Sequence, residues 1–174
     1  MKPEFTWISG ISPGRLATMG HPRGGEWLED EVRDLRQAGV QVVVSALTRP
    51  EVERLGLQRE RVLCTKAGVE FLSFPIPDHG EPASIRRTRH FVRKIVDRLK
   101  KDRAIVVHCF AGIGRSSILA ACAMSVSGTP LQLAWERIGA ARRLPVPDTK
   151  EQRRWVEKFV SRRTATARFD LRGT

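Results

Sequence analysis

The segment around Cys109 holds the residues whose types and spacing are best suited to chemistry. A run of β-branched residues ends at His108 and Cys109, five residues follow, and Arg115 and Ser116 open a predicted apolar helix. We call the turn between strand and helix the cysteine loop (residues 109–114). The first N–H groups of a helix have no acceptor within it, so such a helix start binds anions. The pattern therefore predicts an anion site that faces a thiol.

A phosphate group is the anion that these side chains fit. The planar guanidinium of Arg115 can hold two phosphate oxygens. The positive field of the loop stabilises the Cys109 thiolate, a nucleophile for in-line attack at phosphorus. The Ser116 hydroxyl would donate to that thiolate and help it leave, the alternative being an ordinary helix N-cap. Glycines allow a tight turn and close approach of the backbone, and the residues expected to contact the phosphate, besides Arg115, are Phe110, Ala111, Gly112, Ile113 and Gly114.

Other interpretations of the loop fit the residues less well. A nucleotide-binding P-loop needs a glycine where Cys109 stands and a lysine in place of Arg115. A lone cysteine is often a small buried hydrophobe, but this leaves the spacing of the glycines, arginine and serine to coincidence. We expect His108 to orient the loop by hydrogen bonds, because no CxxC or HxxxH spacing accompanies it. The sequence thus predicts neither a metal nor a cofactor.

The sequence His108-Cys109-x5-Arg115-Ser116 resembles the signature loop of the cysteine-dependent protein tyrosine phosphatases. The layout of residues 10–162 resembles the small dual-specificity, kinase-associated-phosphatase-like branch of that superfamily. The resemblance implies a phosphoprotein phosphatase that acts through a Cys109 phosphocysteine on phosphotyrosine, with phosphoserine and phosphothreonine left open. Two alternatives remain: the same chemistry on a phosphoinositide or an RNA 5′ phosphate, and a catalytically silent phosphopeptide-binding module.

The resemblance also implies a general acid on a mobile loop upstream of the cysteine. Asp78 fits this role, in the turn Pro-Asp-His-Gly that we call the acid loop (residues 77–80). Departure of an alkoxide or phenoxide from phosphorus needs a proton donor near the leaving oxygen. The alternative is an ordinary turn, for which Asp and Gly are common residues. Basic side chains that flank this loop either steer an anionic substrate or form a solvated helix face: His79, Arg86, Arg87 and Arg89.

Residues 146–152 are similar to the family's segment that positions the hydrolytic water. Asp148 stands where a glutamine is often found, and Gln152 matches a second glutamine. The alternative role for Asp148 is to cap the final helix, which suits an aspartate equally well. Cys64 could form a disulfide with Cys109, but a buried free thiol is the favoured reading.

The elements that must position these residues alternate between strands and helices. Apolar runs predict strands at residues 5–8, 14–19, 40–47, 69–76 and 104–108, and helical spacing predicts helices at 26–39, 50–56, 84–101, 116–126, 130–142 and 149–162. This order predicts a single α/β domain with a central, mostly parallel twisted sheet covered by helices on both faces. We assign residues 1–162 to the catalytic domain and residues 163–174 to a loose basic tail.

Composition narrows the partners and the cellular location that we expect for this domain. The chain has 174 residues and a net charge of +12, which favours anionic partners, although a bias toward arginine explains the charge equally well. A phosphorylated protein is the expected partner, and the lysine-free cysteine loop argues against nucleic acid without excluding it. No secretory signal or membrane-spanning run is apparent, and three cysteines are too few for a disulfide framework. We therefore expect a cytoplasmic location.

Overall fold

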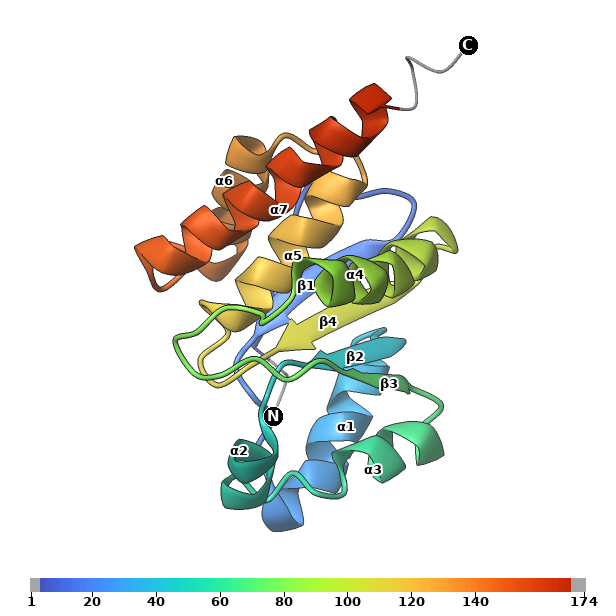
Figure 1. Cartoon of the computed structure of the whole chain (residues 1–174). Helices are drawn as coiled ribbons and strands as arrows, with labels where there is room; N and C mark the ends of the chain where they lie inside the picture. Colours follow the sequence, from blue (N-terminus) through green and yellow to red (C-terminus); the bar gives the residue numbers. More distant parts are fainter. Residues whose placement is uncertain (1–3, 170–174) are drawn as a thin grey trace.

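The computed structural model describes the backbone of residues 4–169 and the side chains of residues 4–162. Its centre is a four-stranded sheet in the order β1-β4-β2-β3, in which every neighbouring pair is parallel. The predicted sheet is confirmed, and it is wholly rather than mostly parallel (Figure 1). The strands are β1 (Arg15–Met19), β2 (Val42–Ser45), β3 (Glu70–Ser73) and β4 (Ala104–His108).

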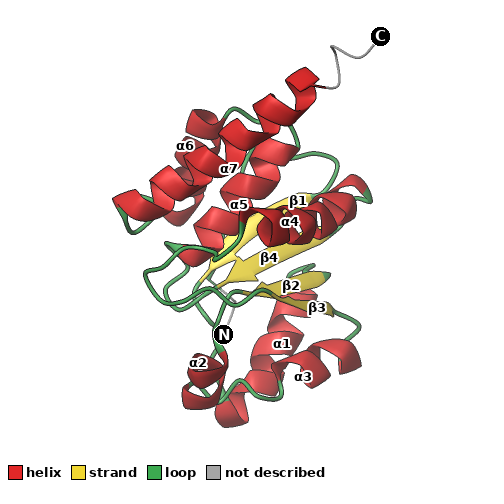
Figure 2. Cartoon of the chain, in the orientation of Figure 1, coloured by secondary structure: helices red, strands yellow, loops and turns green. Residues whose placement is uncertain are grey.

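Helices cover both faces of the sheet, as the alternation of elements predicts (Figure 2). One face is covered by α1 (Leu28–Gln37) and α3 (Glu60–Lys66). The other is covered by α4 (Ile85–Lys100), α5 (Arg115–Val126) and α6 (Leu131–Arg142), and α7 (Lys150–Phe169) packs on α5. A 3₁₀ turn (Gly25–Trp27) precedes α1, and the short α2 (Arg49–Arg54) follows the carboxyl end of β2.

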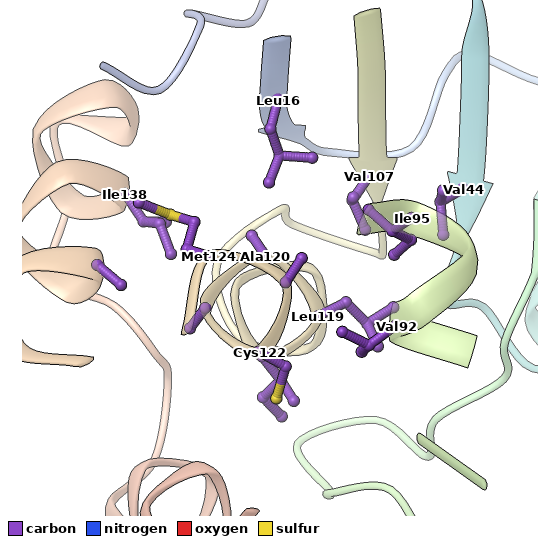
Figure 3. Packing of buried hydrophobic residues seen from close by; sticks show 14 of the residues in the cluster. Leu16, Val44, Val92, Ile95, Val107, Leu119, Ala120, Cys122, Met124 and Ile138 are labelled. Carbon is purple, nitrogen blue, oxygen red and sulfur yellow. The ribbon is translucent and has the colours of Figure 1, made fainter. Parts of the chain in front are cut away.

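Successive side chains of each strand enter opposite cores, as the two-residue period of a strand requires. Val42 and Val44 lie in the core beneath α4 and α5, whereas Val43 lies in the core beneath α1 and α3. Helix α5 is the centre of the larger core, with the sheet on one side and α4 and α6 beside it (Figure 3). Its side chains are buried from Arg115 to Ser125, so the helix that follows the cysteine loop is held rigidly.

Three local predictions differ from the structure. Helix α3 was missed, because seven residues with charged ends give too little periodicity to recognise a helix. The predicted strand at residues 5–8 is reduced to one antiparallel bridge between Trp7 and Ala17. Helix α7 continues past the predicted end to Phe169, and the rest of the predicted tail, 170–174, lies outside the described residues.

The carboxyl ends of the parallel strands meet at one edge of the sheet, which is where ligands bind in open α/β sheets. The cysteine loop leaves β4 there, α2 follows β2, and the acid loop follows β3 (Figure 1). The fold thus gathers three segments that are far apart in the chain. Within the described residues, no helix is both long enough and apolar enough to cross a bilayer.

Candidate active site

Cys109 lies at the end of β4 with 3% of its surface exposed. Its Sγ is 3.3 Å from the Gly112 backbone nitrogen and 3.5 Å from Ser116 Oγ. Both groups can donate a hydrogen bond to a thiolate, which stabilises the charged form of the sulfur. Ser116 is not a helix cap, because α5 begins at Arg115 and Gly114 occupies the N-cap position. Of the two roles considered for Ser116, the structure therefore supports the interaction with Cys109.

Two glycines of the cysteine loop have separate reasons to lack a side chain. Gly112 has a positive φ of 73°, and a Cβ there would also collide with the backbone of Met19 and Gly20 at the end of β1. A Cβ on Gly114 would collide with the Asp148 carboxylate and lie 2.8 Å from Gln152 Oε1. The absence of side chains thus lets β1 support the loop from one side and the start of α7 approach it from the other.

The guanidinium of Arg115 is buried and held in a fixed orientation. Its Nη1 donates to Glu51 Oε2 at 2.8 Å, its Nη2 donates to Glu51 Oε1 at 2.9 Å, and Nη1 also donates to the carbonyl of Ile76 at 3.1 Å. The side chain is 2% exposed. This bidentate pair leaves Nε–H unengaged and able to donate to a ligand held in the loop. Burial alone would lower the pKa of Arg115, but Glu51 and the neighbouring charges of Cys109 and Asp78 raise it.

Glu51 is the functional residue that the sequence analysis missed. It lies in α2, where its Oε2 also accepts from the backbone nitrogen of Thr48 at 2.9 Å and from Thr48 Oγ1 at 2.7 Å. Burial opposes its ionisation, but the hydrogen bonds from Arg115 and Thr48 outweigh this and lower its pKa to about 2. The Thr-x-x-Glu spacing of a capping box was the available signal. That signal reveals the helix start and not the contact with Arg115.

Asp78 reaches the site from the acid loop, as predicted. Its Oδ1 is 2.7 Å from Arg115 Nη2 and accepts from the His79 backbone nitrogen at 3.1 Å. The side chain is 53% exposed, so it stands at the open side of the site while Glu51 stands at the closed side. The structure therefore brings Asp78, Arg115 and Cys109 together, although the Asp78 carboxylate here lies against Arg115 Nη2, where a phosphate oxygen could bind.

The start of α7 lies over the cysteine loop. Thr149 Oγ1 accepts from the Gln152 backbone nitrogen at 3.1 Å, so Thr149 caps the helix, and the capping role considered for Asp148 is wrong. The Asp148 carboxylate instead lies beside Gly114. Gln152 is fully buried, its Nε2 donates to the carbonyl of Gly80 at 3.0 Å, and its Oε1 has no hydrogen-bond partner among the described residues. An unpaired buried acceptor beside the loop is suited to hold a water molecule there.

His108 does not orient the loop through its side chain. Its Nε2 is 3.0 Å from Glu60 Oε1 of α3, and both side chains are buried. Neither imidazole nitrogen has a well-aligned hydrogen-bond partner in the described part of the chain. The backbone of His108 contributes instead, because its carbonyl accepts from the Ala46 nitrogen at 2.9 Å. No group of three His, Cys, Asp or Glu side chains is arranged to hold a metal ion within residues 4–162.

The remaining predicted residues lie around this centre or apart from it. Phe110 is 43% exposed at the rim, with the His21 ring 5.3 Å away. Arg89 is not available to a substrate, because it donates to the carbonyl of Phe159 at 2.6 Å and covers that ring. Cys64 is a free thiol in the core on the opposite face of the sheet from Cys109. Burial and the Glu60 charge raise the pKa of Cys64 to about 12 against a lowering effect of Arg61, which confirms the buried-thiol prediction.

Sequence comparison finds related phosphatase domains. A family model described as "Polymorphic toxin system, DSP-PTPase phosphatase" matches residues 17–129. Cyclin-dependent kinase inhibitor 3 of Rattus norvegicus is 30% identical over 95 residues, which cover 55% of this chain and 44% of that protein. The protein of the same name from Homo sapiens is 27% identical over a region of the same length. The match thus spans less than half the length of these relatives.

Solved structures with the same fold are also found. Kinase-associated phosphatase, with its catalytic-site cysteine replaced by serine, has a TM-score of 0.83 at 20% identity, covering 93% of this chain and 96% of that one. Tk-PTP in its active form has a TM-score of 0.73 at 24% identity, covering 93% and 99%. PTPMT1 has a TM-score of 0.74 at 22% identity, covering 94% and 98%. Because all three are less than 25% identical to this chain, the comparison shows a shared fold and no more.

Proposed function

We propose that this chain, which belongs to the DSP-PTPase phosphatase family of polymorphic toxin systems and so to the dual-specificity protein tyrosine phosphatases, hydrolyses phosphoprotein monoesters through a phosphocysteine at Cys109. The resemblance inferred from the sequence is thereby confirmed at the level of the family. One observation carries the proposal: Cys109 Sγ, 3.3 Å from the Gly112 nitrogen, shares a site with Arg115 and with Asp78, whose Oδ1 is 2.7 Å from Arg115 Nη2.

In the first step the Cys109 thiolate attacks phosphorus and the bond to the leaving oxygen breaks. Arg115 and the loop N–H groups stabilise the equatorial oxygens, where negative charge is concentrated in the transition state. Asp78 gives its proton to the leaving oxygen, so that a neutral phenol or alcohol departs. The products of this step are the dephosphorylated side chain, the Cys109 phosphocysteine and an ionised Asp78.

In the second step a water molecule attacks the phosphocysteine in line with the sulfur–phosphorus bond. Asp78 now accepts a proton from this water, and the bond to Cys109 breaks to release inorganic phosphate and the thiolate. Ser116 assists by donating a hydrogen bond to the departing sulfur, from which its Oγ is 3.5 Å away. Gln152, with its unpaired Oε1 beside Gly114, and Asp148 position the water.

Phosphotyrosine is the substrate that we favour, with phosphoserine and phosphothreonine as further substrates. The chain contains no tyrosine, so a tyrosine that lines a deep pocket in larger relatives has no counterpart and the cleft is expected to be shallow. Residues 1–162 form the catalytic domain in this proposal. A reducing cytoplasmic location is consistent with three free, buried cysteines.

The experiment that tests this function compares turnover of four classes of substrate by the wild type and the Cys109→Ser variant. The substrates are phosphotyrosine peptides, phosphothreonine peptides, phosphoinositides and RNA 5′ phosphates. We expect the peptides to be the best substrates, no turnover by the variant, and no effect of a chelator. One structural neighbour, PTPMT1, has been solved in complex with PI(5)P, so the phosphoinositide is a meaningful competitor in this assay. If it were turned over fastest, the proposed phosphoprotein substrate would be wrong and a lipid substrate would take its place.

A further inference from the structure

A groove of about 490 Å³ lies on the first two turns of α4, on the side of the acid loop. It is lined by Phe74, Arg86, Arg87, His90 and Phe91. Phe74 and Phe91 form its floor, with their rings stacked at 4.6 Å and 25°. Arg86, Arg87 and His90 are exposed and form its wall. The groove therefore combines an apolar floor with cationic sides.

The arginines of this wall are free to bind an anion. Neither Arg86 nor Arg87 makes a side-chain hydrogen bond or ion pair with any residue in the described part of the chain; only the backbone of Arg87 is engaged, by the Ser84 cap. The exposed face of α4 continues with more cations and a single acid: Arg93, Lys94, Asp97 and Lys100. Glu81, in the turn before the helix, is the nearest acid along the chain on the other side. The groove thus has an excess of positive charge, and no carboxylate of residues 4–162 is ion-paired with its arginines.

Its position links the groove to the proposed reaction. Phe74 packs against the edge of the larger core, and its backbone nitrogen donates to the Ser45 carbonyl at the end of β2 at 2.9 Å. The chain then passes Ile76, whose carbonyl holds Arg115, and reaches Asp78. Four residues of extended chain span at most about 14 Å. Phe74 is therefore within about 14 Å of Asp78, a span that about four to six residues of an extended peptide can cover.

We propose that this groove binds an acidic segment of the phosphoprotein substrate, a few residues from the phosphorylated side chain. The proposal rests on the proposed function and specifies the substrate: a peptide with aspartate or glutamate side chains for Arg86 and Arg87, and an apolar side chain for the floor formed by Phe74 and Phe91. Charge complementarity carries the choice of occupant, because unpaired guanidinium groups bind carboxylates through two hydrogen bonds.

Two other anionic partners fit the groove less well. A single-stranded nucleic acid stacks successive bases on several exposed aromatic rings, whereas this groove offers one partly exposed ring, Phe74, stacked on a Phe91 that is 7% exposed. An anionic membrane needs exposed apolar side chains next to the cations. The exposed positions of α4 are all polar or charged. A protein segment is therefore the occupant that the side chains favour.

The test uses the full chain and two charge-matched double variants. Arg86→Gln with Arg87→Gln removes two cations from the groove, while Arg36→Gln with Lys66→Gln removes two exposed cations from α1 and α3 on the other face of the sheet. Melting temperatures verify that each variant is folded. One readout is the ratio of kcat/KM for a phosphotyrosine peptide with four flanking acidic residues to that for the same peptide with glutamines. The other is the affinity for the labelled, non-phosphorylated acidic peptide, measured by fluorescence anisotropy.

We expect the groove variant to lower both the ratio and the affinity by about three- to tenfold, and the control variant to change them by less than about twofold. Equal effects of the two variants would contradict the proposal, because the acidic peptide would then respond to the net charge of the protein and not to the groove. Tighter binding of an RNA oligonucleotide or of vesicles with anionic lipid than of the acidic peptide would also overturn it. The anisotropy measurement needs no turnover, so it tests peptide binding by the groove even if the chain does not hydrolyse phosphopeptides. A failure of hydrolysis alone would contradict only the proposed function.

Discussion

Arg115 Nη2 lies 2.7 Å from Asp78 Oδ1, so the proposed phosphate-binding arginine and the proposed general acid are ion-paired with each other in this conformation. Nη2 also donates to Glu51 Oε1 at 2.9 Å, and Nη1 donates to Glu51 and Ile76. Both Nη1 hydrogens and one Nη2 hydrogen are therefore engaged in hydrogen bonds, the Asp78 carboxylate is ion-paired with Nη2, and Nε–H remains. A phosphate that binds Arg115 through Nε and Nη2 must displace Asp78. Because Asp78 is exposed and Glu51 is buried, we expect the acid loop to move and the contact between Arg115 and Glu51 to remain.

This relationship predicts that Asp78→Ala binds oxyanions more tightly than the wild type. The substitution removes a competitor for Nη2 and a negative charge that repels the incoming dianion. We expect the inhibition constant of inorganic phosphate or vanadate to fall by about three- to tenfold. Asp97→Asn, which removes an exposed carboxylate on α4, is the control. Weaker oxyanion binding by the Asp78 variant would mean that Asp78 assists binding instead of competing with it.

The same variant should reveal the acid role through its dependence on the leaving group. Hydrolysis of a phosphotyrosine peptide should fall by about 10²–10⁴, the usual contribution of a general acid. An aryl phosphate with a very acidic leaving group should lose much less in the phosphorylation step, because its phenoxide departs without a proton. Steady-state kcat/KM across a series of aryl phosphates measures this slope. A uniform loss across the series would exclude Asp78 as the acid.

Glu51 predicts a specific dependence of stability on pH. Its pKa is lowered from an ordinary value of 4.5 to about 2 in the folded chain, so folding favours the ionised form. The resulting stabilisation is present above pH 4.5 and is lost as pH falls from 4.5 toward 2; it amounts to about 3 kcal/mol at neutral pH. Urea unfolding of the wild type and of Glu51→Gln should give a difference that is largest near neutral pH and shrinks below 4.5. A difference independent of pH would contradict an ionised Glu51 paired with Arg115.

The start of α7 allows capping and water positioning to be separated, because Thr149 and Gln152 supply them through different atoms. Thr149→Ala should cost about 0.5–2 kcal/mol of stability and leave the ratio of the two chemical steps as it was. Asp148→Ala and Gln152→Leu should slow hydrolysis of the phosphocysteine more than its formation. Rapid mixing should then show a burst of released peptide in these two variants. A burst in the Thr149 variant alone would reverse the assignment.

The sequence predicted the part of the site that is local in the chain. The path from β4 through the cysteine loop into α5 depends on consecutive residues, a buried β-branched run, two glycines and an apolar helix, so it could be predicted closely. Asp78 was identified through the family resemblance, which implies an acid on a loop upstream of Cys109, and the turn Pro-Asp-His-Gly after a strand fits that role. Each depends on a short stretch of consecutive residues.

The residues that were missed act across long separations. Glu51 meets Arg115 64 positions away, and Glu60 meets His108 from a helix too short for its periodicity to be visible. No local pattern connects these pairs, because the packing of the sheet brings them together. Of the two roles left open for Asp148, the cap of α7 belongs to Thr149 one residue later, because both residue types suit a helix start.

The most direct test of the central claim is chemical identification of the covalent intermediate. Wild-type protein is mixed with excess phosphotyrosine peptide, quenched in acid within the first turnover, digested and analysed by mass spectrometry, with Cys109→Ser as the control. We predict one added phosphoryl group on the fragment that contains Cys109, absent from the control and from the fragments that contain Cys64 and Cys122. Efficient turnover with no phosphoryl group on Cys109 at any quench time, or a phosphoryl group on another residue, would contradict the account.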